Sequence, residues 1–209
     1  MKIKHIVSCF FVSLIGLSAC SIEELPYNQL TEDELDGSYE SLLSATRGNY
    51  AVFKQTAFHQ GWHYAGELAS DNVSLSGVSS DALMYISNYQ RITDNYHMSN
   101  MWGWAYRSII NSNKILEKAQ EGESKEMDQL IGENYFLRGW LEFVLVNVFG
   151  RPYNQSPETN LGIPLKLTAD INDYPMRSTV KESYEQILKD LKKAETLLNS
   201  ESNIYAGPS

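Results

Sequence analysis

The sequence has 209 residues, a formal net charge of −9 and only two cysteines. With so few cysteines a disulfide framework cannot stabilise the fold, so the chain must build a hydrophobic core. An acidic chain without a basic cluster is a poor partner for nucleic acid. The composition therefore favours a protein with a packed core and argues against nucleic-acid binding.

Residues 1–19 have the composition of a signal peptide. Lys2 and Lys4 are basic, and the apolar run that follows is too short to span a bilayer. Small residues then precede Cys20 in the sequence Leu-Ser-Ala-Cys, which resembles the lipobox of bacterial lipoprotein precursors. We therefore predict cleavage before Cys20 and acylation of its thiol, which supplies the two hydrophobic chains that stable anchoring requires. The alternative is an ordinary secretory signal that happens to contain this cysteine.

Residues 20–30 are predicted to form an acidic tether. Glu23 and Glu24 follow the cysteine closely, Pro26 comes next, and no hydrophobic periodicity is present. Acidic residues at this place resemble the surface-export signal of lipoproteins in the Bacteroides group. The predicted location is the outer membrane, with the protein lipid-anchored and exposed at the cell surface.

Helical periodicity begins after the tether. Thr31 and Glu34 have the spacing of a capping box, and apolar residues then recur every three or four positions. These features predict a first helix over 32–57. Gly61 and Gly66 are expected to interrupt the pattern beyond it.

The middle of the chain alternates between irregular and strongly periodic sequence. The stretch 70–96 is rich in Ser, Asn and Asp, and only a short helical turn is predicted there, over 82–89. Apolar stripes predict two further helices, over 99–120 and 124–148. Asn113 falls on the first of these stripes, so it is expected to hydrogen-bond between helices.

The last third combines an extended segment with one more helix. Residues 150–177 are predicted to be extended and turn-like because prolines punctuate them. Thr179 and Glu182 form a capping-box pattern that predicts a helix over 179–199. Asp190 and the charged residues after it are expected to form a solvated face of this helix. No strand pattern is present, so the predicted fold class is all-α.

Five blocks of sequence follow the lipobox in a recognisable order. They are Glu67–Val73, the stripe from Trp102 to Leu116, Glu133–Gly139, Leu145–Leu165 and Arg177–Ala194. Together they resemble the N-terminal half of the SusD/RagB family of nutrient-uptake outer-membrane lipoproteins. The family prefers alanine where this chain has Gly139, which is a small-for-small change.

The resemblance implies a SusD-like α-helical fold with tetratricopeptide-like helix pairs. It also implies that the protein forms a lid over a TonB-dependent, SusC-like transporter and helps to capture glycans or other large nutrients. Because family members are considerably longer, residues 31–209 are expected to be a SusD-like N-terminal domain, and the chain looks truncated, without the C-terminal half.

Sugar recognition requires flat aromatic faces that stack on pyranose rings, together with amides or carboxylates for the hydroxyl groups. The candidate ligand-binding residues are the aromatic residues outside the helical stripes, namely Trp62, Tyr64, Tyr85, Tyr89 and Tyr96. Asn88, Gln90, Arg91 and Asn95 lie between them. Their loop-like setting favours binding; the alternative is that they pack this segment onto the helices. Trp102 and Tyr106 lie on a helical stripe and are predicted to be core.

Metal binding and catalysis have weak support. His59, His63 and Glu67 are spaced four residues apart, but the glycines between them and the lack of a zinc-protease motif argue against a metal site. Glu67 and Asp71 could form a carboxylate pair for glycoside cleavage. The sequence contains no nucleophile elbow and no phosphate-binding loop. We therefore predict a protein that is not an enzyme and holds no cofactor or metal.

Three functions remain open. The first is a glycan-binding lipoprotein that works with the transporter. The second is a structural adaptor whose helices dock on the transporter while another subunit holds the ligand. The third, and the least supported, is a lipid-anchored glycoside hydrolase that uses Glu67.

Overall fold

The structure is a computed structural model, and it describes residues 35–70, 72–77, 81–90 and 92–198. The predicted signal peptide, Cys20, the tether and the Thr31–Glu34 capping box lie outside these ranges. Among the described residues, no helix combines the length and the apolar character needed to cross a membrane.

The first helical segment differs from the single helix that the sequence predicts. Helix α2 covers Tyr39–Asn49, the 3₁₀ helix η1 covers Tyr50–Lys54, and α3 covers Thr56–His63. The π-helix η2 then covers Tyr64–Leu68. Gln55 separates η1 from α3 because its backbone is extended, with φ −76° and ψ 110°.

The expectation that Gly61 and Gly66 interrupt the helix is wrong, because helical backbone continues through both residues. Gly61 allows a close approach between helices. A Cβ at this position would lie 2.5 Å from the Cβ of Met101 and 2.7 Å from the carbonyl oxygen of His97. The absent side chain therefore allows α3 to lie directly against the next long helix.

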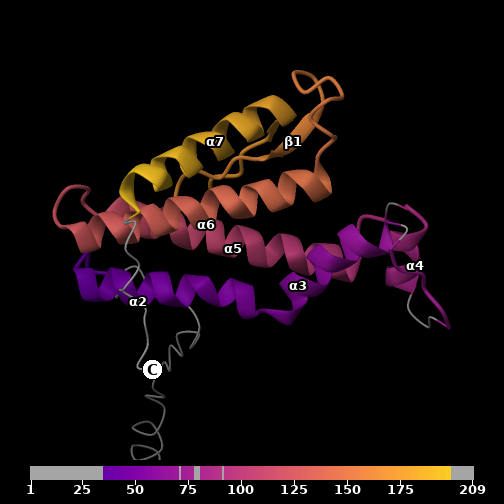
Figure 1. Cartoon of the computed structure of the whole chain (residues 1–209), viewed down its shortest axis with the longest axis horizontal. Helices are drawn as coiled ribbons and strands as arrows, with labels where there is room; N and C mark the ends of the chain where they lie inside the picture. The colour runs from indigo at the N-terminus through magenta and orange to yellow at the C-terminus, as the bar shows by residue number, and fades with distance from the viewer. Residues whose placement is uncertain (1–34, 71, 78–80, 91, 199–209) are drawn as a thin grey trace, which may run out of the picture. The chain divides into compact units, whose positions relative to one another are not determined.

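The two central helices match the sequence expectation closely. Helix α5 covers Tyr96–Lys118 and α6 covers Lys125–Phe149. The side chain of Asn95 accepts hydrogen bonds from the backbone amides of His97 and Met98, so it forms the N-cap of α5. The connection between α5 and α6 is short, which makes the two helices antiparallel neighbours (Figure 1).

Helix α7 covers Val180–Leu197 and begins with the predicted capping box. The side chain of Thr179 accepts a hydrogen bond from the Glu182 amide, and the Glu182 carboxylate accepts one from the Thr179 amide. In Figure 1 the long helices follow one another in the order α2, α5, α6 and α7, so that α6 lies between α5 and α7.

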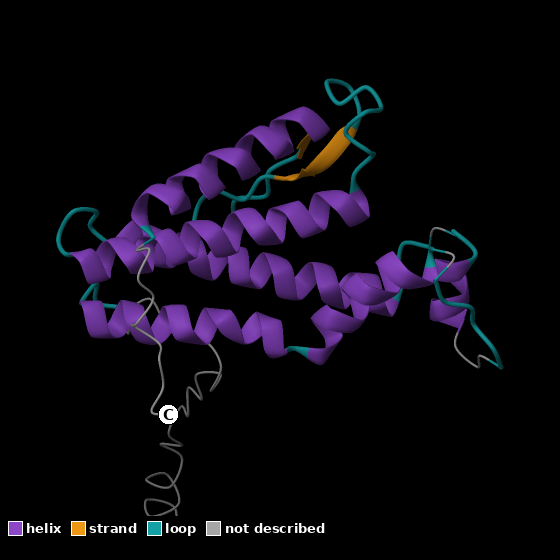
Figure 2. Ribbon diagram, in the orientation of Figure 1, coloured by secondary structure: helices purple, strands orange, loops and turns teal. Residues whose placement is uncertain are grey.

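A small ribbon is the exception to the all-helical prediction (Figure 2). Strand β1 covers Leu161–Pro164 and pairs antiparallel with β2, which covers Arg177–Thr179. Side chains add further hydrogen bonds to this pairing. The Ser178 hydroxyl donates to the carbonyl of Ile163 at 2.7 Å, and the Arg177 guanidinium donates to the carbonyl of Gly162 at 2.8 Å. Strands this short cannot show a period of two in the sequence, which is why the pattern gave no signal.

Two hydrophobic clusters form the core. The larger one lies where the N-terminal half of α5 meets the C-terminal part of α6, and it includes Phe58, Met101, Ile109, Leu141, Leu145, Ile163 and Ile187. The smaller one lies where α2 meets the ends of α5 and α6, and includes Leu42, Ile115, Met127 and Leu130. Trp102 and Tyr106 are partly buried against the larger cluster, as predicted.

A buried polar network corrects one prediction and confirms another. Asp190 is not part of a solvated face: it is 1% exposed and pairs with the guanidinium of Arg138 through bonds of 2.6 and 2.8 Å. The same guanidinium donates to the side chain of Asn113 at 2.7 Å. Asn113 in turn donates to the carbonyls of Lys166 and Thr168, both at 2.9 Å, so it connects α5 to α6 and to the extended segment.

Candidate ligand-binding site

A pocket of about 550 Å³ lies beside η2 and the short helix α4, which covers Asp81–Ser87. In Figure 1 this region is at the end of the molecule where α4 is labelled. The residues that line the pocket are Leu68, Ala69, Ser70, Val73, Ser74, Leu75, Met84, Ser87, Asn88 and Tyr89. The lining contains both polar and apolar side chains, and none of these residues carries a charged group.

Local hydrogen bonds shape the pocket. The hydroxyl of Ser70 donates to the carbonyl of Glu67 at 2.8 Å and accepts from the amide of Asn72 at 3.2 Å. Tyr89 has a left-handed backbone, with φ +56°, and its hydroxyl donates to the carbonyl of Ala69. The Asn95 amide group donates to the carbonyl of Ala82 at 2.9 Å, which connects α4 to the start of α5.

Two tyrosines next to this region present their rings to solvent. Tyr89 is 73% exposed and Tyr96 is 66% exposed. The ring of His97 lies 5.5 Å from that of Tyr96 and 4.9 Å from that of Tyr64. Burial lowers the pKa of His97, so the imidazole is neutral at pH 7 and this aromatic group carries no charge.

The five aromatic residues singled out by the sequence do not form one site. Tyr89 lines the pocket, whereas Tyr64 and Tyr96 meet at His97. Tyr85 is on α4 and does not line the pocket. Trp62 belongs to a different surface, because its ring contacts that of Trp140 on α6 at 5.3 Å.

Several pocket residues were not among the five. Asn88 lies between the predicted aromatics and does line the pocket, whereas Asn95 serves as a helix cap. Ser70, Val73, Met84 and Ser87 also line the pocket, and nothing in the sequence indicated a binding role for them because they are common residue types. Ser70 and Val73 had been noted only as part of the family-like block Glu67–Val73. Only the folding of α4 against η2 brings them together.

The residues considered as metal ligands and as a carboxylate pair make other contacts in the structure. The His59 ring bonds to the carbonyl of Phe53, and its centroid is 6.1 Å from that of His63 in a stacked geometry. Glu67 accepts from the Asn72 side chain at 3.3 Å, and Asp71 lies outside the described residues. Within the described ranges, no group of three His, Cys, Asp or Glu side chains is placed to hold a metal ion.

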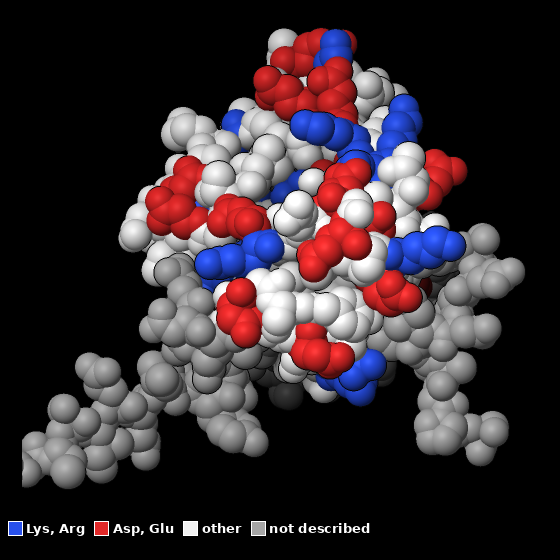
Figure 3. Space-filling model, turned by 90° about the vertical axis from the view of Figure 1, so that its left-hand side faces the viewer, with Lys and Arg blue, Asp and Glu red and all other residues white. Residues whose placement is uncertain are grey.

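Charges of both signs are mixed on the end of the molecule seen in Figure 3. Lys, Arg, Asp and Glu alternate there, so the described part of this face has no extended basic patch.

The described residues define a class of protein: antiparallel helix pairs that carry an uncharged, tyrosine-bordered pocket at one end. The sequence matches the family described as "Starch-binding associating with outer membrane" over residues 22–209. Because this match covers most of the chain, the protein belongs to the SusD-like family. A comparison with the sequences of curated proteins gave no match.

Solved structures support the same fold. A SusD superfamily protein from Bacteroides vulgatus superposes with a TM-score of 0.71 at 23% identity, over 79% of this chain and 39% of that chain. A SusD superfamily protein from Bacteroides fragilis gives a TM-score of 0.62 at 25% identity, over 82% and 42% of the two chains. A SusD-like carbohydrate binding protein from Bacteroides fragilis gives 0.56 at 16% identity, over 82% and 34%.

The chain therefore spans well under half of the length of these solved relatives. What the superpositions establish is the SusD-like helical fold of the matched region. The activity and partners of a whole family member do not follow from this match alone.

Proposed function

We propose that this chain is a cell-surface lipoprotein that binds a glycan and works with a TonB-dependent, SusC-like outer-membrane transporter, without catalysing a reaction. The observation that carries the proposal is a pocket of about 550 Å³ whose described lining residues carry no charged group, with the exposed ring of Tyr89 at its edge. The family description, which names starch binding and association with the outer membrane, supports the same function.

The chemistry of the pocket suits a neutral sugar. One face of a pyranose ring is apolar and can stack on an exposed aromatic ring, here that of Tyr89. The hydroxyl groups need donors and acceptors, which the side chains of Ser70, Ser87 and Asn88 can supply. The described lining offers no ammonium or guanidinium group to neutralise an acidic sugar.

The membrane anchor is the second part of the proposal. Acyl chains on Cys20 would hold the helical domain at the outer membrane, where a transporter could receive the glycan. The acidic residues after Cys20 support exposure at the cell surface.

Isothermal titration with neutral oligosaccharides, beginning with maltooligosaccharides, tests the binding function. We expect Tyr89→Ala to weaken binding roughly five- to tenfold, because one stacking contact contributes about 1 kcal/mol. Tyr89→Phe keeps the ring and loses only the hydroxyl bond to Ala69, so it should bind nearly as well as the wild type.

Tyr174→Ala is the matched control. This tyrosine is 85% exposed and does not line the pocket, so its removal should leave the affinity unchanged. Absence of heat with every neutral glycan, in protein shown to be folded, would contradict the binding function. That result would favour the adaptor alternative, in which the helices dock on the transporter and another subunit holds the sugar.

A further inference from the structure

Helix α4 is one wall of the pocket, yet the hydrophobic core does not hold it in place. The helix contributes Met84 and Ser87 to the lining, and Asn88 and Tyr89 follow directly after its last residue. None of its seven residues, all of which the structure describes, is buried. A helix this short is not stable by itself, because isolated helices need about a dozen residues or more. The position of this wall therefore depends on its contacts with neighbouring elements.

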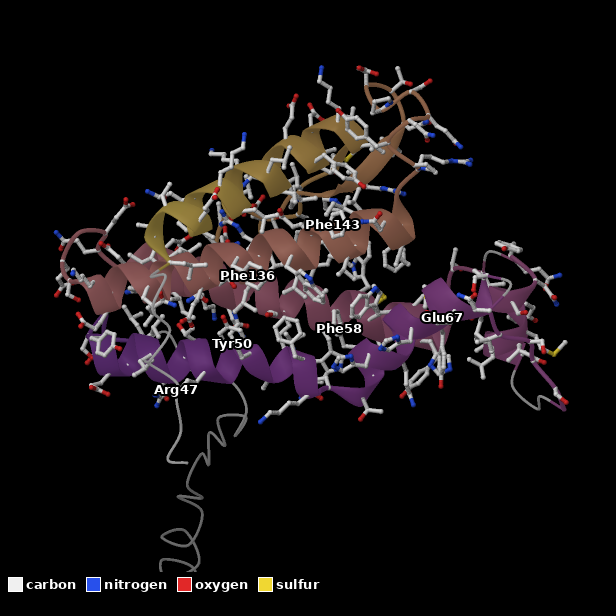
Figure 4. The ribbon with its side chains drawn as sticks, viewed as in Figure 1. Arg47, Tyr50, Phe58, Glu67, Phe136 and Phe143 are labelled. Atoms are coloured by element: carbon white, nitrogen blue, oxygen red, sulfur yellow. The ribbon has the colours of Figure 1, made fainter. Side chains whose placement is uncertain are left out.

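Hydrogen bonds from side chains fix both ends of the α4 segment. After its last turn, the Tyr89 hydroxyl donates to the carbonyl of Ala69, which follows η2. At its first turn, the carbonyl of Ala82 accepts a hydrogen bond of 2.9 Å from the side-chain amide of Asn95. Figure 4 labels Glu67, a residue of η2, at the end of the molecule where Figure 1 labels α4. The two bonds thus connect α4 to η2 and to the start of α5.

Asn95 uses both halves of its side-chain amide and is only 5% exposed. Its oxygen accepts from the backbone amides of His97 and Met98 at 3.1 and 3.3 Å, which caps α5. Its nitrogen donates to the carbonyl of Ala82. Asparagine, aspartate and serine can all supply the capping oxygen. Only asparagine adds an NH₂ donor beside that oxygen, so capping alone does not account for this residue.

We infer that Asn95 is a positioning residue of the pocket: its bond to Ala82 holds α4 against α5 in the arrangement that binds the ligand. The inference rests on the proposed glycan-binding function, and it adds a residue that does not itself line the pocket. A ligand that contacts both α4 and η2 binds only the docked arrangement, so its affinity scales with the fraction of molecules in which α4 is docked. Loss of one hydrogen bond shifts such an equilibrium about fivefold.

Two substitutions separate the capping of α5 from the positioning of α4. Asn95→Ser and Asn95→Asp each keep an oxygen that can cap α5, and neither supplies the NH₂ donor for Ala82. Two variants keep the test open if one of them fails to fold. Ser38→Ala is the matched control, because it removes the N-cap of α2, where the Ser38 hydroxyl accepts from the Ser41 amide at 3.4 Å. Ser38 does not line the pocket.

Hydrogen exchange of backbone amides in the full chain measures the docking of α4 without any ligand. The reporters are the amides of Asn88 and Gln90, which close the end of α4 by bonding to carbonyls within the helix. They are protected only while α4 is docked, because an undocked helix of this length does not stay folded. We expect Asn95→Ser and Asn95→Asp to lower their protection about fivefold. Ser38→Ala should leave it unchanged.

Isothermal titration with a maltooligosaccharide that binds the wild type completes the test. The two Asn95 variants should bind it about two- to fivefold more weakly, and Ser38→Ala should bind it like the wild type. Unchanged protection of the reporter amides in both Asn95 variants would overturn the inference, and so would wild-type affinity in both. If no neutral glycan binds the wild type, the proposed function fails, and the exchange of the reporter amides still decides whether Asn95 holds α4.

Discussion

Glu142 places a carboxyl group inside the helical core. Its side chain is fully buried, and neither of its oxygens has a hydrogen-bond partner among the described residues. Burial raises its pKa to about 8; the negative charge of Asp190 acts in the same direction, and Arg138 opposes it. Glu142 is therefore protonated at pH 7.

A folded-state pKa above the usual value of 4.5 makes stability depend on pH. Between pH 4.5 and about 8 the folded protein keeps the Glu142 proton and the unfolded chain loses it, so the free energy of unfolding falls as the pH rises. Each unit of pKa difference corresponds to about 1.4 kcal/mol. We expect Glu142→Gln to reduce this loss, as measured by urea unfolding at pH 5, 6, 7 and 8.

Glu185→Gln is a suitable control, because Glu185 is exposed on α7. This variant should follow the wild-type dependence of unfolding free energy on pH. If Glu142→Gln and the wild type lose the same free energy of unfolding between pH 5 and 8, the proton that the folded protein keeps over this range is not on Glu142.

At the scale of the helices, one ion pair connects most of the fold. Arg138 on α6 pairs with Asp190 on α7 and also donates to Asn113 on α5. Asn113 holds the carbonyls of Lys166 and Thr168, which brings the extended segment into the same network. The ion pair with Asp190 raises the pKa of Arg138 although burial alone would lower it, so the guanidinium keeps its charge.

Removing one partner of a buried pair leaves an uncompensated charge, so Asp190→Ala is expected to lower the free energy of unfolding by about 3–5 kcal/mol. The comparison is Lys193→Ala, which breaks an ion pair on the surface. In this pair the Lys193 ammonium lies 2.5 Å from the Glu121 carboxylate, and the two side chains are 36% and 52% exposed. That change should lower stability by less than about 1 kcal/mol. Chemical denaturation of both variants measures the difference, and equal losses would contradict the assigned importance of the buried pair.

Most of the helices could be predicted from the sequence because their signals are local. The apolar stripes of α5 and α6 and the capping box of α7 place these helices within a few residues of their observed ends. The first predicted helix, over 32–57, was only partly right. Its periodicity continues through Gln55, but the backbone there becomes extended and divides the segment.

At the scale of the whole molecule, the proposed lipid anchor on Cys20 decides where the helical domain operates. Two acyl chains on one residue give stable membrane attachment, whereas a single chain binds the membrane only reversibly. The anchor lies outside the described residues, so it has to be tested in the intact precursor expressed in a bacterial host.

Extraction with a phase-separating detergent gives that test. The wild-type protein should partition into the detergent phase, and Cys20→Ser should move to the aqueous phase because it cannot be acylated. Cys9→Ser is the matched control, because Cys9 belongs to the predicted signal peptide and its loss should leave the detergent partitioning unchanged. Wild-type protein in the aqueous phase would contradict the anchor.

The candidate site was less predictable than the helices. Tyr89 could be singled out because it is aromatic and lies in an irregular segment, and it does line the pocket. Trp62 met the same criteria, yet it contacts Trp140 on another surface. Residue type and a loop-like setting identify candidates for binding, but they contain no information about which candidates lie next to one another.

The sequence by itself determined the helical class, the capping of α7, the structural role of Asn113 and membership of the SusD-like family. These features depend on residues close together in the chain or on ordered blocks. Only the tertiary structure decided that Asp190 is buried, that β1 pairs with β2 and that α4 and η2 enclose a pocket. Each of these depends on contacts between residues distant in sequence, which no local pattern specifies.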